Sequence, residues 1–210
     1  MADIDALRAY GRQLFAPEDD ALRWIQAEAD RHELRRISLD ADEARLLQLL
    51  VLAAGAAKVV EFGTLAGYSG TWIARALPPG GRLWTLEVSS KHARIARASF
   101  EHAGVADRVT VVEGAILDSL PKLSREAPFD FIFMDANPES YVDYLAWAAG
   151  ALRPGGALVA HNAFASGNVT APVDDRSRGM AAFQAELARR PDFAAGLVPF
   201  GEGMVFAVKR

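Results

Sequence analysis

The sequence predicts an α/β protein with a doubly wound, mostly parallel, seven-stranded sheet that ends in an antiparallel C-terminal hairpin. Two observations predict this fold class. Short apolar runs alternate with helical patterns through the middle of the chain, and strands that are apolar throughout and separated by helices are typical of a parallel sheet covered on both faces. Residues 196–210 instead hold two apolar runs joined by Gly201-Glu202-Gly203, which is typical of a hairpin.

The predicted elements begin with a charged helical segment. Residues 1–38 have the pattern of an amphipathic helix pair, which is either a solvated surface feature or a lid or dimer contact over the mouth of the sheet. Asp40 and Glu43 form a capping box for a helix over residues 41–53. In that helix four leucines are expected to face inward, namely Leu46, Leu47, Leu49 and Leu50.

Five parallel strands are predicted from apolar runs rich in β-branched and aromatic residues. They cover residues 58–63, 82–88, 108–114, 129–136 and 156–162, and helical patterns cover 71–77, 91–103 and 141–152. A polar stretch at 169–179 is expected to be a mobile loop before a helix at 180–189. We find no repeat and no linker, so residues 1–210 are expected to form one domain.

Composition excludes several classes of function. With 210 residues and 51% hydrophobic content, the chain can bury a full core. The net charge of −4 argues against a nucleic-acid partner, and no apolar run approaches the roughly 20 residues of a membrane span. Asp3 and Asp5 do not fit a signal peptide, so a cytoplasmic protein is expected. Cysteine is absent, which excludes thiolate metal sites but would suit any compartment.

Ligands of open parallel sheets bind beyond the carboxyl ends of the strands, near the switch point. The first strand ends at Glu61, and glycines at 63, 67 and 70 follow it without forming a phosphate loop or the G-x-G-x-x-G fingerprint. Glu87 ends the second strand, where its carboxylate could accept both hydroxyls of a ribose. Ala115 follows the third strand and is small enough to lie against an adenine ring. The pattern therefore indicates an adenosine ligand without a pyrophosphate.

These residues carry a family resemblance. The run VVEFGTLAGYSGTWIARALPPGGRLWTLEV (59–88) resembles the core of S-adenosylmethionine-dependent methyltransferases, and more narrowly the catechol and caffeoyl-CoA type O-methyltransferases. The similarity extends from about Leu39 to the closing VPFGEGMVFAVKR. It implies a Rossmann-like fold, S-adenosylmethionine as cofactor and a homodimer. It also implies cofactor contacts at Leu39, Glu61, Gly63, Thr64, Ser69, Glu87, Ala115 and Asp135, with Asn137 where the family often has an acid.

The sequence departs from the family pattern at two strand ends. The family ends its fourth strand in an Asp-Ala-Asp-Lys type run and its fifth in Asp-Asn. The first Asp of the run and the Asp-Asn pair hold a divalent metal, and the lysine assists deprotonation of the acceptor hydroxyl. Here the fourth strand gives Asp135-Ala136-Asn137-Pro138 and the fifth gives His161-Asn162. The resemblance thus implies a metal set of Asp135, His161 and Asn162, in which an imidazole replaces a carboxylate and proline replaces the lysine.

His161 has three interpretations. An imidazole ligand suits Mn²⁺, Fe²⁺ or Zn²⁺ better than Mg²⁺, so the site could bind a softer metal weakly. Alternatively the site holds no metal, and His161, beside Asp135, is the general base for an acceptor phenol, whose pKa is about 10. This second interpretation is our prediction, against a purely structural histidine. The other histidines, His32, His92 and His102, are expected on solvated helix faces.

Three hypotheses of function follow. The first is methyl transfer from S-adenosylmethionine to a hydroxyl of a small, aromatic, phenol- or catechol-like acceptor. The second is a cofactor-binding protein of the same fold without transferase activity, because Pro138 and His161 break the catalytic pattern. The third is an NAD-dependent oxidoreductase, which the missing dinucleotide fingerprint disfavours.

Overall fold

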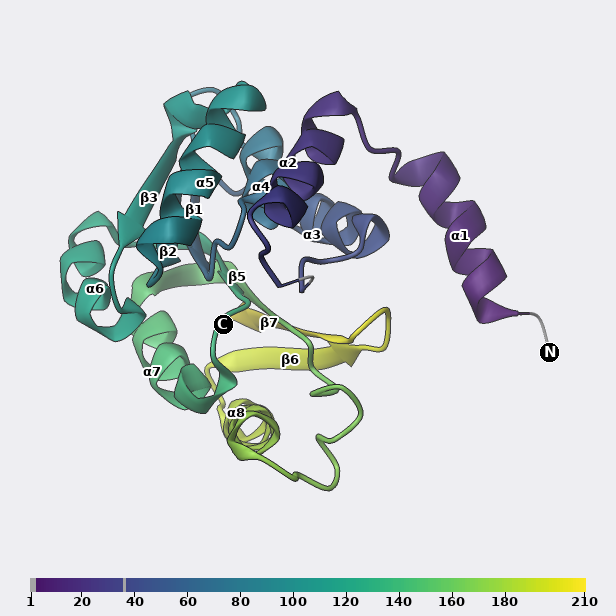
Figure 1. The fold of residues 1–210 in the computed structure, drawn as a ribbon. Coiled ribbons are helices and arrows are strands. Elements are labelled where there is room, and N and C mark those ends of the chain that lie inside the picture. Colours follow the sequence, from purple (N-terminus) through teal and green to yellow (C-terminus); the bar gives the residue numbers. More distant parts are fainter. Residues whose placement is uncertain (1–2, 36) are drawn as a thin grey trace.

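The computed structural model describes residues 3–35 and 37–210, and it confirms the predicted sheet (Figure 1). Seven strands lie in the order β3-β2-β1-β4-β5-β7-β6. The first five pair in parallel, and β7 lies antiparallel between β5 and β6. The order reverses between β1 and β4, which is where a ligand site is expected. The strands are β1 (Lys58–Phe62), β2 (Arg82–Glu87), β3 (Val109–Glu113), β4 (Phe129–Met134), β5 (Leu152–His161), β6 (Phe193–Val198) and β7 (Met204–Lys209).

Helices cover both faces of the sheet (Figure 1). The side chains of α2, α3, α4 and α5 pack on one face, and those of α6, α7 and α8 pack on the other. The helices are α1 (Ile4–Phe15), α2 (Asp20–Arg31), α3 (Ala41–Ala53), α4 (Tyr68–Ala76), α5 (Ser90–His102), α6 (Ile116–Leu123), α7 (Tyr141–Ala151) and α8 (Asp175–Arg189). In the described part of the chain, no helix is both long and apolar enough to cross a membrane.

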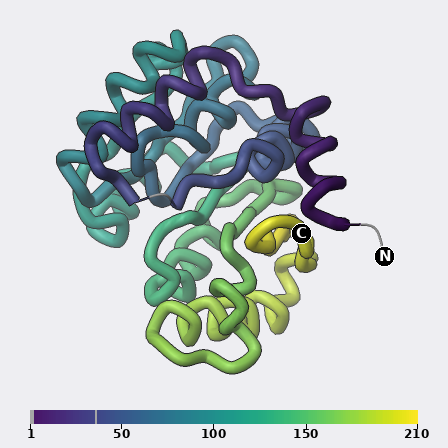
Figure 2. Tube along the Cα trace, turned by 45° about the vertical axis from the view of Figure 1, so that its right-hand side comes forward, coloured from purple at the N-terminus to yellow at the C-terminus, as the bar shows by residue number. Residues whose placement is uncertain are grey.

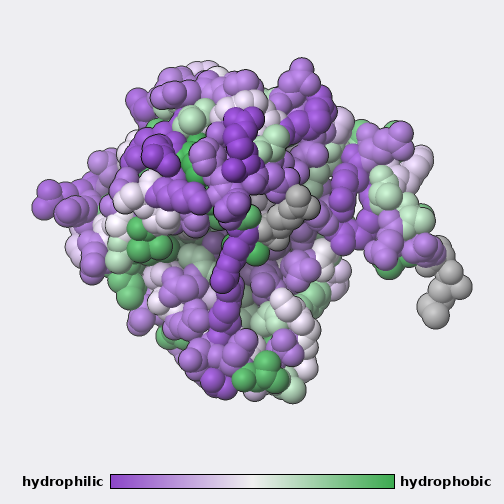
Figure 3. All heavy atoms as spheres, in the orientation of Figure 1, coloured by the Kyte–Doolittle hydropathy of each residue, from purple (hydrophilic) through white to green (hydrophobic). Residues whose placement is uncertain are grey.

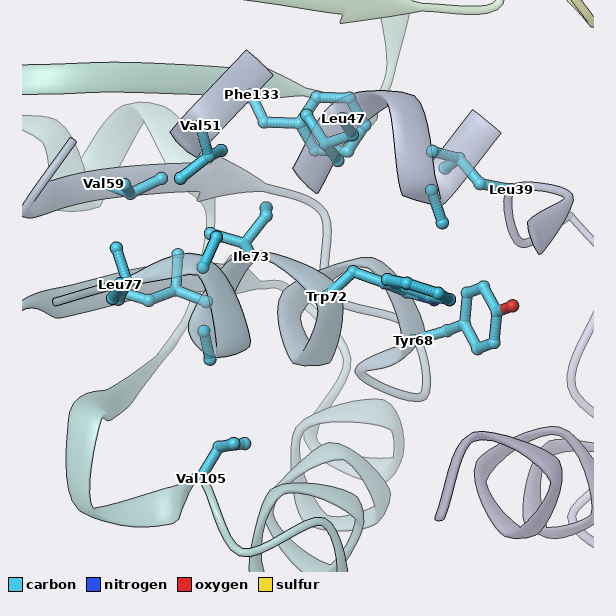
Figure 4. Packing of buried hydrophobic residues seen from close by; sticks show 14 of the residues in the cluster. Leu39, Leu47, Val51, Val59, Tyr68, Trp72, Ile73, Leu77, Val105 and Phe133 are labelled. Carbon is cyan, nitrogen blue, oxygen red and sulfur yellow. The ribbon is translucent and has the colours of Figure 1, made fainter. Parts of the chain in front are cut away.

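The core divides into two layers because side chains alternate along each strand. In β1, Val59 faces α3 and α4, where Leu47 and Ile73 are fully buried against it (Figure 4). Val60 and Phe62 face the opposite layer, with α7 and α8. Burying apolar side chains on both faces explains the continuously apolar strands, and each such side chain contributes about 1.5–3 kcal/mol.

Several predicted boundaries were wrong. The helix α8 begins at Asp175 rather than residue 180, because Asp174 and Ser177 form a capping box within the stretch predicted as loop. The strand β5 begins at Leu152, directly after α7. Leu49 is 51% exposed rather than inward-facing, because the core stripe of α3 runs through Ala44, Leu47 and Val51.

The predicted N-terminal helix pair is present, and its two helices differ in burial. Leu22 and Ile25 anchor α2 in the core, whereas no described residue of α1 is buried. Figures 1 and 2 both show α1 projecting from the rim of the molecule. Its polar side is tied to the start of α3, since Arg8 and Arg12 form ion pairs with Asp40 and Asp42.

Candidate active site

A cavity of about 1020 Å³ opens at the carboxyl ends of β1, β2, β4 and β5. This volume suits a cofactor together with a small second molecule. Ten of the eleven site residues predicted from the sequence line it: Leu39, Gly63, Thr64, Ser69, Glu87, Ala115, Asp135, Asn137, His161 and Asn162. The eleventh, Glu61, lies behind the wall and is fully buried.

The floor of the cavity is the close contact between the ends of β1 and β4. Gly63 has φ +92°, and a Cβ built on it would collide with the carbonyl oxygen of Asp135. The amide of Asp135 donates to the carbonyl of Phe62 at 2.9 Å, and Gly63 donates to Leu86 at 3.0 Å. The absence of a side chain at Gly63 therefore allows the ends of β1 and β4 to lie in contact beneath the cavity.

Glu87 holds the loop that follows β1. Its Oε2 accepts from the amides of Thr64 (3.3 Å) and Leu65 (2.9 Å), and its Oε1 accepts from Ser89 (2.9 Å). A carboxylate has about four acceptor sites, so capacity remains for a ligand hydroxyl. His92, which we expected on a solvated face, also lines the cavity, with Nδ1 3.5 Å from Glu87 Oε1.

Glu61 supports the wall of the cavity from behind. Ser69 Oγ donates to its Oε1 at 2.6 Å, while Oε2 is buried with no hydrogen-bond partner among the described residues. Burial, opposed by hydrogen bonds from Ser69 and Thr85, raises the pKa of Glu61 to about 7. In this structure Glu61 reaches the cavity only through Ser69, and its direct contact with a cofactor stays a prediction.

The polar side chain of Asn137 is used locally. Its Nδ2 donates to Ser140 Oγ at 2.8 Å, and Tyr144 donates to its Oδ1 at 2.9 Å. Tyr141, fully buried like Tyr144, accepts the amide of Ala136 at 3.1 Å. The turn after β4 is therefore fixed by α7, and Asp135, at its start, presents a partly exposed carboxylate to the cavity.

His161 lies between two carboxylates at the tip of β5. Its Nε2 is 3.2 Å from Glu43 Oε1, and its Nδ1 is 3.5 Å from Asp135 Oδ1. Burial by itself lowers the pKa of His161, but the Asp135 and Glu43 carboxylates outweigh it and raise the pKa to about 10. Burial by itself would raise the pKa of Glu43, but the hydrogen bond with His161 outweighs burial, so that the pKa lies below its usual value. The two carboxylates therefore favour the protonated form of His161.

The donor atoms that the resemblance implies for a metal have partners within the protein. Nε2 of His161 contacts Glu43 Oε1 at 3.2 Å, and Nδ1 lies 3.5 Å from Asp135 Oδ1. Asn162 has φ +53°, and its Oδ1 accepts the amide of Ser166 at 3.1 Å. Within residues 3–35 and 37–210, no group of three His, Asp or Glu side chains is arranged to hold a metal ion.

Sequence reasoning missed several residues of the cavity. Glu43 was recognised as a helix cap, and it does accept the amide of Asp40 at 3.0 Å, but the same carboxylate also reaches His161. Two arginines, Arg8 from α1 and Arg176 from α8, also line the cavity. No local sequence signal marks them, because each is brought to the cavity by a segment distant along the chain.

A family model described as O-methyltransferase matches residues 13–210. The chain belongs to this O-methyltransferase family. Among its relatives is a catechol O-methyltransferase of Mycobacterium tuberculosis, 44% identical over 158 residues that cover 75% of this chain and 71% of the relative. Another catechol O-methyltransferase, from Niastella koreensis, is 41% identical over 168 residues, which cover 79% of this chain and 76% of the relative.

Solved structures agree with this assignment. An O-methyltransferase from Bacillus cereus in complex with SAH has a TM-score of 0.93 at 36% identity, covering 98% of this chain and 97% of that one. The O-methyltransferase TomG from Streptomyces achromogenes, in complex with SAM, has a TM-score of 0.92 at 35% identity. The match covers 100% of this chain and 99% of TomG. This O-methyltransferase is therefore an S-adenosylmethionine-dependent enzyme of Rossmann-like fold, as the family resemblance implied.

Proposed function

We propose that this enzyme methylates a hydroxyl of a small aromatic acceptor of the phenol or catechol type. The observation that carries the proposal is that one cavity combines two sets of groups. Glu87 and Ala115 line one part of it, with the chemistry of an adenosine site, and Asp135 and His161 line another. The naming of two relatives as catechol O-methyltransferases supports the acceptor class.

The residues of the chain bind the cofactor, orient the acceptor and remove the proton of its hydroxyl. Bound S-adenosylmethionine supplies a methyl group on a positively charged sulfur. Glu87 accepts from the ribose, and Ala115 leaves room for the adenine. Asp135 would take the proton of the acceptor hydroxyl, which would leave a nucleophilic oxygen for the methyl group that the bound cofactor would supply.

The general-base role that we predicted for His161 is revised in this proposal. A general base must be neutral and must offer a free nitrogen within hydrogen-bond reach of the acceptor proton. Both nitrogens of His161 already face carboxylates, and its pKa of about 10 keeps it protonated at neutral pH. Asp135 is the partly exposed acid beside it on the cavity wall, so it is assigned the proton.

A turnover screen tests the proposal. The enzyme is incubated with S-adenosylmethionine and a panel of phenols, catechols and aliphatic alcohols, and the demethylated cofactor and methylated product are quantified. We expect turnover with catechols or phenols and none with the alcohols. Binding of S-adenosylmethionine without methylation of any aromatic hydroxyl would contradict the proposal and leave a cofactor-binding protein.

Glu87→Gln is expected to weaken S-adenosylmethionine binding about tenfold to hundredfold. The amide side chain would keep one oxygen for the Thr64 and Leu65 amides, while its NH2 group would face the Ser89 amide. It would lose the charge-assisted hydrogen bonds to the ribose, worth about 1.5–3 kcal/mol. Isothermal titration calorimetry measures the change. Glu113→Gln is the matched control, because Glu113 pairs with Glu87 across the sheet but does not line the cavity. Equal affinity in wild type and Glu87→Gln would remove Glu87 from the cofactor site.

We further propose that the enzyme is a cytoplasmic homodimer and that α1 contributes to the contact. Five large apolar side chains of α1 are more than half exposed: Ile4, Leu7, Tyr10, Leu14 and Phe15. Figure 3 shows apolar side chains on this projecting helix. A helix with a polar side tied to α3 and an uncovered apolar side is suited to burial against a second copy.

A measurement of the oligomeric state tests whether the enzyme is a dimer and whether α1 forms the contact. Light scattering after size exclusion should give a dimer for wild type and a monomer for the double variant Leu7→Glu, Leu14→Glu. Gln13→Glu adds a charge at an exposed polar position of the same helix and should stay dimeric. A monomeric wild type, or a dimeric double variant, would contradict the role of α1.

A further inference from the structure

The helix α8 carries an arginine on the side that faces the protein. Its buried apolar residues Met180, Phe183 and Leu187 recur at the spacing of one helix face. Arg176 lies four residues before Met180 and so begins the same stripe, one turn nearer the start of the helix. At this end the stripe leaves the core and meets the cavity, which Arg176 lines. The periodicity that buries α8 therefore also presents Arg176 to the site.

The start of α8 is fixed against the turn that follows β4. Gly179 packs on the backbone of this turn, and a Cβ built on it would collide with the carbonyl group of Pro138. Asp174 closes a capping box at the first turn of the helix. The backbone that carries Arg176 is therefore held in place beside the cavity.

The guanidinium of Arg176 is not used within the described part of the chain. It forms no hydrogen bond or ion pair with a described residue, whereas the neighbouring Arg178 pairs with Asp175 at 2.7 Å. Two acids lie close to it along the chain or on the same cavity, Asp174 and Glu139, and neither forms an ion pair with it; Asp174 instead caps α8. The charge of Arg176 is therefore available to a ligand.

Arg176 lies on the flank of the cavity away from the adenosine-type residues. Glu87 and Ala115 lie at the ends of β2 and β3, on one side of the switch point, while α8 packs beside α7 and β6 on the other. Ser166 lines the cavity from the loop that joins β5 to α8, and its hydroxyl forms no hydrogen bond with a described residue. This flank therefore presents two hydrogen-bond donors, a guanidinium and a hydroxyl, to a molecule that lies beside the cofactor.

We propose that Arg176 selects acceptors that carry a carboxylate, so that the substrate of this enzyme is a hydroxylated aromatic acid. This inference rests on the proposed function for the reaction itself. The planar fork of a guanidinium matches a carboxylate with two parallel hydrogen bonds, and the Ser166 hydroxyl supplies a third donor on the same flank. Holding the acid group at α8 leaves the hydroxyl end of the ring for Asp135 and the cofactor. Arg176 is a specificity-determining residue and takes no part in the proton transfer.

Turnover of matched acceptors tests the inference. The enzyme is given dihydroxybenzoate, its methyl ester and the corresponding phosphonate, and kcat/KM is measured for each. We expect the acid to exceed the ester about tenfold to hundredfold, as is usual for a charge-assisted hydrogen-bonded pair. Equal values for acid and ester would overturn the inference, and a phosphonate preferred tenfold over the acid would overturn the assignment of a carboxylate.

Variants at two arginines of α8 assign the preference to one side chain. Arg176→Gln should lower kcat/KM for the acid and leave that for the ester unchanged, while Arg176→Lys should keep part of the preference, because an ammonium keeps the charge but not the fork. Arg178→Gln is the matched control, since Arg178 pairs with Asp175 and does not line the cavity. An equal loss on acid and ester in Arg176→Gln, or loss of the preference in Arg178→Gln as well, would overturn the role of Arg176.

A binding measurement separates this inference from the proposed function. Dimethoxybenzoate has no hydroxyl to methylate, so calorimetry can measure its affinity for the enzyme loaded with the demethylated cofactor, without turnover. Wild type should bind this acid at least tenfold more tightly than its methyl ester, and Arg176→Gln should bind the two equally. Equal affinities in wild type, or no detectable binding of the acid, would overturn the inference. Failure to methylate any aromatic hydroxyl would instead defeat the proposed function, while this titration would still decide the role of Arg176.

Discussion

Gly63→Ala is expected to destabilise the enzyme by about 2–5 kcal/mol and to weaken S-adenosylmethionine binding at least tenfold. Gly63 has φ +92°, a conformation that costs a residue with a side chain about 1–2 kcal/mol. The new methyl group would also collide with the backbone of Asp135, and relieving such overpacking costs about 1–3 kcal/mol more. The shift would separate the ends of β1 and β4, between which the cavity lies.

Gly80→Ala is the matched control for this prediction. Gly80 has φ +80°, but a Cβ on it would meet nothing within 4 Å. This variant should therefore lose only the stability that a positive φ costs a residue with a side chain, about 1–2 kcal/mol, and should keep its affinity for the cofactor. Urea unfolding and calorimetry would measure both quantities. If the two variants were equally stable and bound the cofactor equally, the close approach of β1 and β4 would not be needed by the site.

The free energy of unfolding is expected to fall between pH 7 and pH 10 by on the order of 3 kcal/mol more in wild type than in His161→Gln. The folded protein keeps the pKa of His161 at about 10, against 6.5 for an ordinary histidine. A raised pKa stabilises the folded state fully below about pH 6.5, and this stabilisation is lost as the pH rises through 10. Each pKa unit corresponds to about 1.4 kcal/mol, which sets the magnitude.

Urea unfolding at several pH values checks this expectation. The charged groups that contact His161 are Glu43 and Asp135, and both are present in the two proteins, so the titration of the ring dominates the difference between them. Other groups that titrate above pH 7 are shared and cancel. Parallel pH curves for wild type and His161→Gln would show that His161 is neutral at pH 7 and would contradict the geometry described here.

Local sequence pattern was sufficient to predict the fold, and with the family resemblance it named residues that line the cavity. Strand ends such as Glu61 and Glu87 are recognisable because each closes an apolar run, and in a parallel sheet all such ends reach the same edge. The glycines after β1 can also be recognised in the sequence, because only glycine readily adopts the backbone conformation that this turn requires. Predicted helix and strand boundaries were wrong where two local patterns conflict. At Asp174 a helix cap lies within a polar stretch that resembles a loop, and α8 therefore begins earlier than predicted.

The contacts of His161 were decided by tertiary structure alone. The sequence placed an imidazole beside Asp135 and led us to predict a general base, but a metal ligand or a structural group would use the same residue at the same strand end. Glu43 is 118 residues away along the chain, and its local pattern is fully explained as a helix cap. Only the packing of α3 against the tip of β5 brings its carboxylate to the second ring nitrogen. The protonation state of a buried group depends on every charge within a few ångströms, and these distances do not exist in the sequence until the chain has folded.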